Sequence, residues 1–87
     1  MNVQLDLLAA MNNLCSGSEI KILLVVLECE SMALTTSQML KLTGITKPNN
    51  YFRTRKQLIN LGYLIIKDDH MHVNYYKILK DYEKLSS

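Results

Sequence analysis

The stretch that decides the fold is residues 44–76, which read GITKPNNYFRTRKQLINLGYLIIKDDHMHVNYY. Its first residue, Gly44, suits the left-handed conformation in which many helices end, so we expect a preceding helix to stop there. Thr46 is a natural N-cap, and Pro48 fits the first turn of a helix, where its missing N–H is not needed. These signals predict a new helix over residues 47–61, which ends at Gly62.

A β-hairpin is predicted directly behind this helix. Residues 63–67 form an apolar strand, Asp68 and Asp69 form the turn, and a second strand runs from about Met71 to Tyr76. Strand alternation separates an inward set, Met71, Val73 and Tyr75, from the outward polar candidates, which are Lys67, His70, His72 and Asn74.

A shorter helix is predicted just ahead of Gly44. Thr35 and Gln38 have the spacing of a capping box, which starts a helix over residues 36–42. We expect this helix to turn Met39, Leu40 and Leu42 inward. Residues 32–34 precede it as a short extended strand.

Two helices are predicted in the first third of the chain. The first covers residues 2–14, and the apolar residues on one of its faces are Val3, Leu7, Met11 and Leu14. The second runs from Glu19 to about Ser31 and is apolar on most sides, which is typical of a central core helix. Ser16 and Glu19 have capping-box spacing, although Ser18 is a rival N-cap. β-branched residues in this run could argue for a strand, but its length favours a helix.

The last element is a helix from Lys77 to Leu85, with Ile78, Tyr82 and Leu85 on one face. The predicted order is therefore helix, helix, short strand, helix, turn, helix, hairpin, helix. Two helices joined by a glycine-containing turn and followed by a hairpin form the winged variant of the helix-turn-helix motif.

The residues themselves also resemble a known family. Residues 44–47 (GITK) and 51–64 (YFRTRKQLINLGYL) are similar to winged helix-turn-helix domains of bacterial regulators and of plasmid or phage accessory proteins. The resemblance covers residues 19–76 and implies an α+β fold that is mostly helical. We expect one domain over residues 1–87, in which an N-terminal helix (1–15) and a C-terminal helix or tail (77–87) flank the winged-helix core.

The composition excludes several classes of protein. The chain has 87 residues, 48% of them apolar and 21% charged, which favours one globular domain. Its longest charge-free apolar run is residues 22–27, too short to span a bilayer, and no secretory signal is visible. Cys15 and Cys29 stand alone, which indicates reduced thiols and a cytoplasmic protein rather than a disulfide scaffold or zinc finger.

Charge is unevenly distributed along the chain. Residues 1–30 carry four acids and one lysine, and residues 68–87 carry four acids and three lysines. Residues 31–67 contain no acid and six cations: Lys41, Lys47, Arg53, Arg55, Lys56 and Lys67. A local excess of positive charge favours a polyanionic partner, although a solvated basic face without a partner is the alternative.

The predicted helix 47–61 has one wholly polar face. At 100° per residue, about 120° of arc contains Asn49, Asn50, Arg53, Lys56, Gln57 and Asn60. Arginine can bond guanine bidentately, and asparagine or glutamine can bond adenine in the same way. We therefore expect this face to read bases in the major groove of double-stranded DNA; an ordinary solvated face is the alternative.

Other charged residues are expected at the edge of this interface. Lys41 and Lys47 are placed to touch the sugar–phosphate backbone, and Lys67, His70 and His72 would add contacts from the hairpin. Asp68 and Asp69 would repel phosphate at the tip. Arg55 falls on the other side of helix 47–61, among its apolar residues. We therefore expect it to be half-buried with Glu28 or Glu30 as its partner, or to extend outward to a phosphate.

Neither catalysis nor a cofactor is predicted. The chain has only three glycines and no phosphate-binding glycine loop, and no nucleophile, base and orienting group can be assigned. His70 and His72 share a strand face, but two imidazoles without a third ligand make a weak metal site.

The sequence thus predicts a sequence-specific double-stranded DNA-binding protein that is not an enzyme. A plasmid or phage accessory factor for replication or transfer and a small transcription regulator both fit. The alternative is a winged-helix module that binds protein and not DNA. We also expect a homodimer, joined mainly by the N-terminal helix with help from the tail, that binds paired repeats about one helical turn apart.

Overall fold

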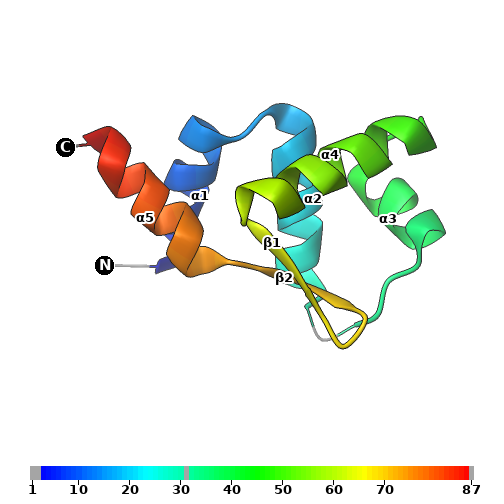
Figure 1. Ribbon diagram of the computed structural model, residues 1–87. Coiled ribbons are helices and arrows are strands. Elements are labelled where there is room, and N and C mark those ends of the chain that lie inside the picture. Colours follow the sequence, from blue (N-terminus) through cyan, green and yellow to red (C-terminus); the bar gives the residue numbers. More distant parts are fainter. Residues whose placement is uncertain (1–2, 31, 87) are drawn as a thin grey trace.

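The computed structural model describes residues 3–30 and 32–86, and these form five helices and one antiparallel hairpin (Figure 1). In chain order the elements are α1 (Val3–Leu14), α2 (Gly17–Glu28), α3 (Thr36–Thr43), α4 (Pro48–Leu61), β1 (Leu64–Lys67), β2 (His70–Val73) and α5 (Tyr75–Ser86). The expected mostly helical α+β class is confirmed. Three predicted positions lie outside the described part of the chain. They are residue 2 and Ser31, at the predicted ends of two helices, and residue 87 of the predicted tail. None of the described helices has the length and apolarity needed to cross a bilayer.

The core is built on α2. Its side chains Ile22, Leu23 and Val26 are almost completely buried, and α3, α4 and β2 all pack against it. Ser16 starts the helix through a capping box: its backbone N–H donates to Glu19 Oε1 over 2.8 Å, and its hydroxyl accepts from the Glu19 N–H over 3.4 Å. This confirms a core helix here, with Ser16 and not Ser18 as its N-cap. The helix ends at Glu28, before the predicted end near Ser31.

The terminal helices α1 and α5 pack on each other at one end of the molecule (Figure 1). Leu7, Met11 and Ile78 from their apolar faces are buried there, Leu14 and Tyr82 are half-buried, and Leu85 is exposed. The side chain of Val3 lies outside the described part. The buried residues of these faces close the chain's own core, which leaves less of the N-terminal helix for the expected dimer contact. The homodimer itself stays a prediction.

Helix α3 begins at Thr36, as predicted, and ends at Thr43, one residue later than predicted, and it buries a different face. Gln38 and Thr35 form the expected capping box, and Gly44 ends the helix at φ 74°. Thr43 is buried and Leu42 is 54% exposed, so the predicted inward position of Leu42 is wrong. The buried Thr43 hydroxyl is satisfied within the helix, because it donates to the Met39 carbonyl. Residues 32–35 pair with no strand in the described chain, so the predicted short strand is absent from these residues.

Two predictions about helix starts are also wrong. The N-cap of α4 is Lys47, without a side-chain bond, and not Thr46; Pro48 at the next position has a fixed φ that suits a first turn. The second strand stops at Val73 because the Asn74 side-chain oxygen accepts from the Lys77 N–H and starts α5. Tyr75 is therefore an exposed helix residue and not an inward strand residue.

The hairpin turn has the geometry that two-residue loops prefer. Lys67 pairs with His70, so only Asp68 and Asp69 lie between the strands, and both have positive φ, 53° and 64°. Left-handed conformation at both central residues gives a type I′ turn, whose twist matches that of the strands. Aspartate accepts this conformation more readily than most residues do.

Gly44→Ala should lower the free energy of unfolding by about 1–2 kcal/mol, because φ 74° is strained for a residue with a Cβ. An added Cβ would meet no atom within 4 Å, so the effect isolates the backbone. Gly17→Ala is the matched control: that Cβ also has open space, but the residue lies in α2 with no positive φ. Urea denaturation of both variants measures the difference, and equal effects would contradict the strain argument.

Candidate nucleic-acid interface

Helix α4 is fixed by the burial of two side chains. Tyr51 and Leu58 are 2% and 0% exposed, and both project from the side of α4 that packs on α2 and the core. The opposite side is therefore turned to solvent. We call it the α4 face, and its residues, all of them exposed, are Asn49, Asn50, Arg53, Lys56, Gln57 and Asn60.

Two lysines extend the cationic surface beyond α4. Lys41 lies in the last turn of α3 and Lys47 at the N-cap of α4, and both are exposed. Lys41 also carries positive charge where the helix dipole favours it, which is a structural reason for a lysine there. No acidic residue occurs between positions 31 and 67, so α3, the turn and α4 share one uninterrupted positive field.

Arg55 is half-buried, as expected, but without the expected partner. Neither Glu28 nor Glu30 forms an ion pair with it within the described residues. The Glu30 carboxylate instead accepts a hydrogen bond from the Tyr75 hydroxyl and lies 3.5 Å from His72 Nδ1. Packing of β2 on α2 brings the Tyr75, His72 and Glu30 groups together.

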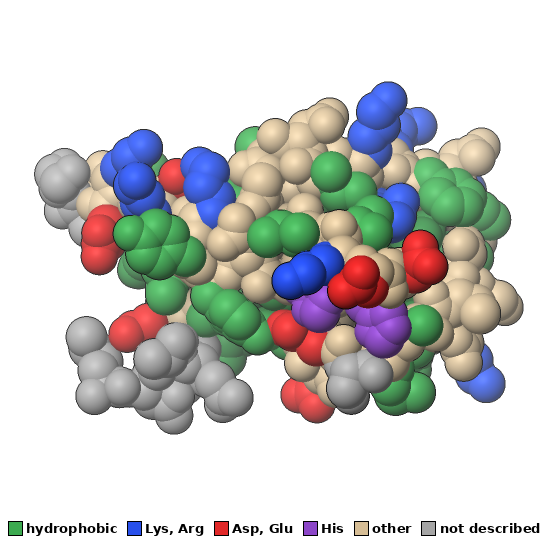
Figure 2. Space-filling view, turned by 60° about the horizontal axis from the view of Figure 1, so that its bottom comes forward, with side chains coloured by type: hydrophobic (Ala, Val, Ile, Leu, Met, Phe, Trp, Pro, Cys, Tyr) green, Lys and Arg blue, Asp and Glu red, His purple; other side chains and the backbone are tan. Residues whose placement is uncertain are grey.

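The hairpin presents a face of mixed charge. The strand register places Ile65, Lys67, His70 and His72 on one face, while Leu64 and Val73 are buried on the other. The two imidazole rings are stacked with centroids 6.4 Å apart, and Figure 2 shows them side by side with acidic and cationic side chains around them. With Glu30, Asp68 and Asp69 nearby, this surface is not cationic at neutral pH.

Sequence reasoning did not find Glu30 as a hairpin neighbour. It lies 42 positions before His72, and nothing local to either residue indicates the contact. Its carboxylate pairs with an imidazole when that ring is protonated. Within the described ranges, no three His, Cys, Asp or Glu side chains come together as a metal site would require.

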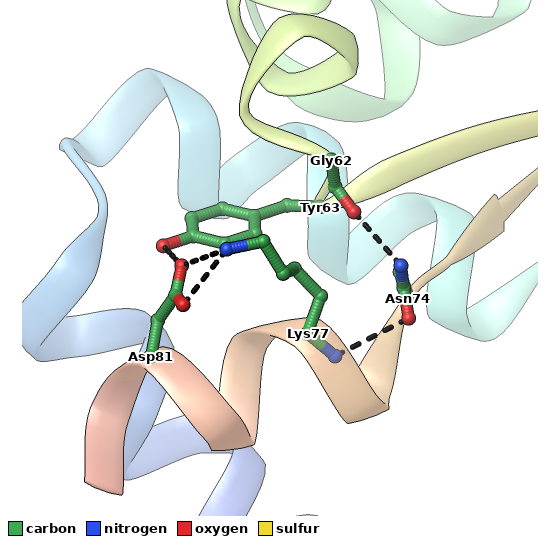
Figure 3. Close-up of polar contacts among 5 residues, drawn as sticks. All are labelled: Gly62, Tyr63, Asn74, Lys77 and Asp81. Carbon is green, nitrogen blue, oxygen red and sulfur yellow. Dashed lines mark hydrogen bonds and ion pairs between the residues drawn. The ribbon is translucent and has the colours of Figure 1, made fainter. Parts of the chain in front are cut away.

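A polar network at the end of α4 sets the direction of the hairpin (Figure 3). The Asn74 side-chain amide donates to the Gly62 carbonyl over 3.0 Å, and its backbone N–H donates to the Tyr63 carbonyl over 2.8 Å. The same side chain caps α5. Asn74 was expected to be an outward polar residue of the wing, but it joins the end of α4 to the start of α5.

The second half of this network links Tyr63 to α5. The Tyr63 hydroxyl donates to Asp81 Oδ2 over 2.7 Å, and Lys77 Nζ lies 2.8 Å from both carboxylate oxygens (Figure 3). Burial and the bond to Asp81 raise the pKa of Tyr63. The hydrogen bonds from Lys77 and Tyr63 lower the pKa of Asp81. The neutral phenol and the ionised carboxylate are therefore the forms that the fold favours.

Cys15 lies near this network and is a poor nucleophile. Burial, with the neighbouring Glu19 carboxylate, raises the pKa of its thiol to about 11. The thiolate is the reactive form, so this cysteine is chemically quiet at neutral pH.

Comparison of the chain with protein-family models, with curated proteins and with solved structures found no match. The functional argument therefore depends on the geometry and charge of the described residues.

Asp81→Asn should destabilise the protein at pH 7 and much less at pH 3. Because the folded state lowers the pKa of Asp81, its stabilising effect is complete above the ordinary carboxyl pKa of about 4 and is lost as the pH falls through the lower, folded value. Urea denaturation of wild type and variant at both pH values measures the gap. Glu83→Gln, at an exposed carboxylate on the same helix, should show no such gap. An Asp81→Asn gap that is the same at both pH values would contradict the assignment.

Proposed function

We propose that this chain is a sequence-specific double-stranded DNA-binding protein of the winged helix-turn-helix class. In this proposal α3, the turn at Gly44 and α4 are the helix-turn-helix, and β1 and β2 are the wing. The observation that carries it is the α4 face, which is exposed, polar throughout and free of acids. A helix face selected only for solubility usually mixes glutamate with lysine and gains ion pairs between turns.

The chemistry of the α4 face matches what base edges offer. An α-helix fits the major groove, where Arg53 can donate two bonds to a guanine and Asn49, Asn50, Gln57 or Asn60 can bond an adenine bidentately. Lys41 and Lys47 lie at the edge of the face and would contact phosphates. Such contacts fix orientation without reading sequence.

The wing contributes less than α4 in this proposal. Lys67 is its one permanent cation, and Asp68, Asp69 and Glu30 offset it at neutral pH. Affinity and specificity therefore come mainly from α3 and α4. A small regulator of transcription and an accessory factor for plasmid or phage replication or transfer both fit such a protein.

Selection of bound sequences from a pool of random duplexes tests the proposal directly. We expect the pool to converge on a short motif, because the face carries several groups that bond bases bidentately. The position of that motif beside promoters or beside origins of replication or transfer would then separate the two roles. Failure to enrich any motif, together with no shift of random duplex, would favour the alternative of a protein-binding module.

Arg53→Ala should weaken binding to the selected motif by about 1–3 kcal/mol and relax the preference at one base pair. Fluorescence anisotropy with the motif and its single-base variants measures both effects. Lys80→Ala removes an exposed cation on α5, away from α4, and should change neither. Equal losses on the motif and on random duplex would mean that Arg53 touches only phosphate.

Binding should also weaken steeply with salt. If four to six phosphates are neutralised, the slope of log K against log[salt] should be roughly −4 to −5, because each contact releases a condensed counterion. Titrations at several salt concentrations give this slope. A slope near zero would rule out the positive field of residues 31–67 as the source of affinity.

A further inference from the structure

One strip of the central helix is uncovered. Along α2, Lys21, Leu24 and Glu28 are all exposed, and their spacing of three and four residues puts them on the same face. We call these three residues the α2 stripe. The opposite side of the same helix holds its most deeply buried residues, Ile22, Leu23 and Val26, so the stripe is the only long side of α2 left to solvent among the described residues.

The stripe is a ridge between two hollows, of which the larger has a mixed lining that includes Glu28 and the smaller is almost wholly apolar. The larger, of about 650 Å³, separates Leu24 from Leu8 of α1 and Tyr75 of α5. The smaller, of about 240 Å³, separates it from Leu42 of α3. Leu8, Leu24, Leu42 and Tyr75 are each between 37% and 54% exposed. A concentration of large apolar side chains around one ridge marks an interaction surface more often than a free one.

The charges on this ridge indicate what would cover it. Lys21 lies one turn before Leu24 and Glu28 one turn after it, about 10 Å apart along the helix axis. A two-fold axis requires a surface that is complementary to itself. If two α2 helices cross antiparallel at Leu24, each Lys21 faces Glu28 of the partner subunit, so the contact contains two opposite-charge pairs around an apolar centre.

We propose that the α2 stripe is the interface of a two-fold homodimer. The hollows on either side of each Leu24 provide room for the ridge of the second copy to pack into, as helix ridges pack into grooves. This interface differs from the N-terminal one expected from the sequence, of which Leu7, Met11 and Ile78 are buried within the chain. It does not depend on DNA binding, because every contact involves this chain alone.

Charge reversal tests the pairing. Lys21→Glu should weaken dimerisation roughly tenfold or more, because two attractive pairs become two repulsive ones, and Glu28→Lys should do the same. The double variant should dimerise like wild type, with both pairs restored in reverse. An equimolar mixture of the two single variants should form a mixed dimer, because the acidic stripe of one faces the basic stripe of the other.

The two single variants are not expected to harm the helix itself. Lys21 lies near the N-terminus of α2, where a glutamate is favoured by the helix dipole, and Glu28 is its last residue, where a lysine is favoured. Thermal unfolding of each variant in the monomeric concentration range checks this. Lys80→Glu, an exposed reversal on α5 outside the stripe, is the matched control and should leave dimerisation unchanged.

Sedimentation equilibrium without DNA gives the mass of each protein and of the mixture, against a chain mass of 10.0 kDa. Wild type that stays at the mass of one chain up to high micromolar concentration would overturn the proposal. So would a dimer that survives both single reversals, or a double variant and a mixture that both remain monomeric. None of these outcomes bears on whether the monomer binds duplex DNA, which the selection experiment measures separately.

Discussion

Burial of α2 is the constraint on which the other elements depend. Its apolar side chains Ile22, Leu23 and Val26 must be shielded from water, and α3, α4 and β2 pack against the helix. Once α4 is held against α2 by Tyr51 and Leu58, the period of the helix alone turns its six polar residues outward. Likewise, packing of β2 against α2 brings His72 to Glu30. The position of the candidate interface thus depends on buried apolar contacts, and none of the exposed residues of the α4 face takes part in them.

What the sequence predicted well is what depends on near neighbours. Capping boxes at Ser16 and Thr35 and the left-handed glycines Gly44 and Gly62 involve residues within three or four positions, so each could be recognised locally. One error was local, because the N-cap of α4 is Lys47 and not Thr46. Other errors arose where a group distant in the sequence decided the outcome. Asn74 suits a strand by alternation, but the Gly62 carbonyl and the first turn of α5 engage its side chain. Leu42 suits a buried position by hydropathy, but the arrangement of α3 on α2 leaves it exposed.

The candidate site also has one part that the sequence could predict and one part that it could not. The α4 face follows from a single number, the residues per turn, and its exposure could be predicted before any packing was known. The wing could not be treated like this, because its charge depends on Glu30 from the end of the core helix. Sequence reasoning gave Lys67, His70 and His72 a share in phosphate contact from their own charges. The structure adds the Glu30 carboxylate beside His72 to the Asp68 and Asp69 carboxylates of the turn, so we expect α3 and α4 to supply most of the binding.

The position of the α2 stripe determines how the two α4 faces of the proposed dimer would be oriented. Helices α1 and α5 flank the stripe on one side and α3 on the other, while α4 and β2 also pack on α2 and leave the stripe exposed. Two copies joined stripe to stripe would turn their α4 faces away from each other. If α4 binds duplex DNA and the α2 stripe joins two copies, both as proposed, such a dimer would hold two separate stretches of duplex rather than neighbouring sites along one.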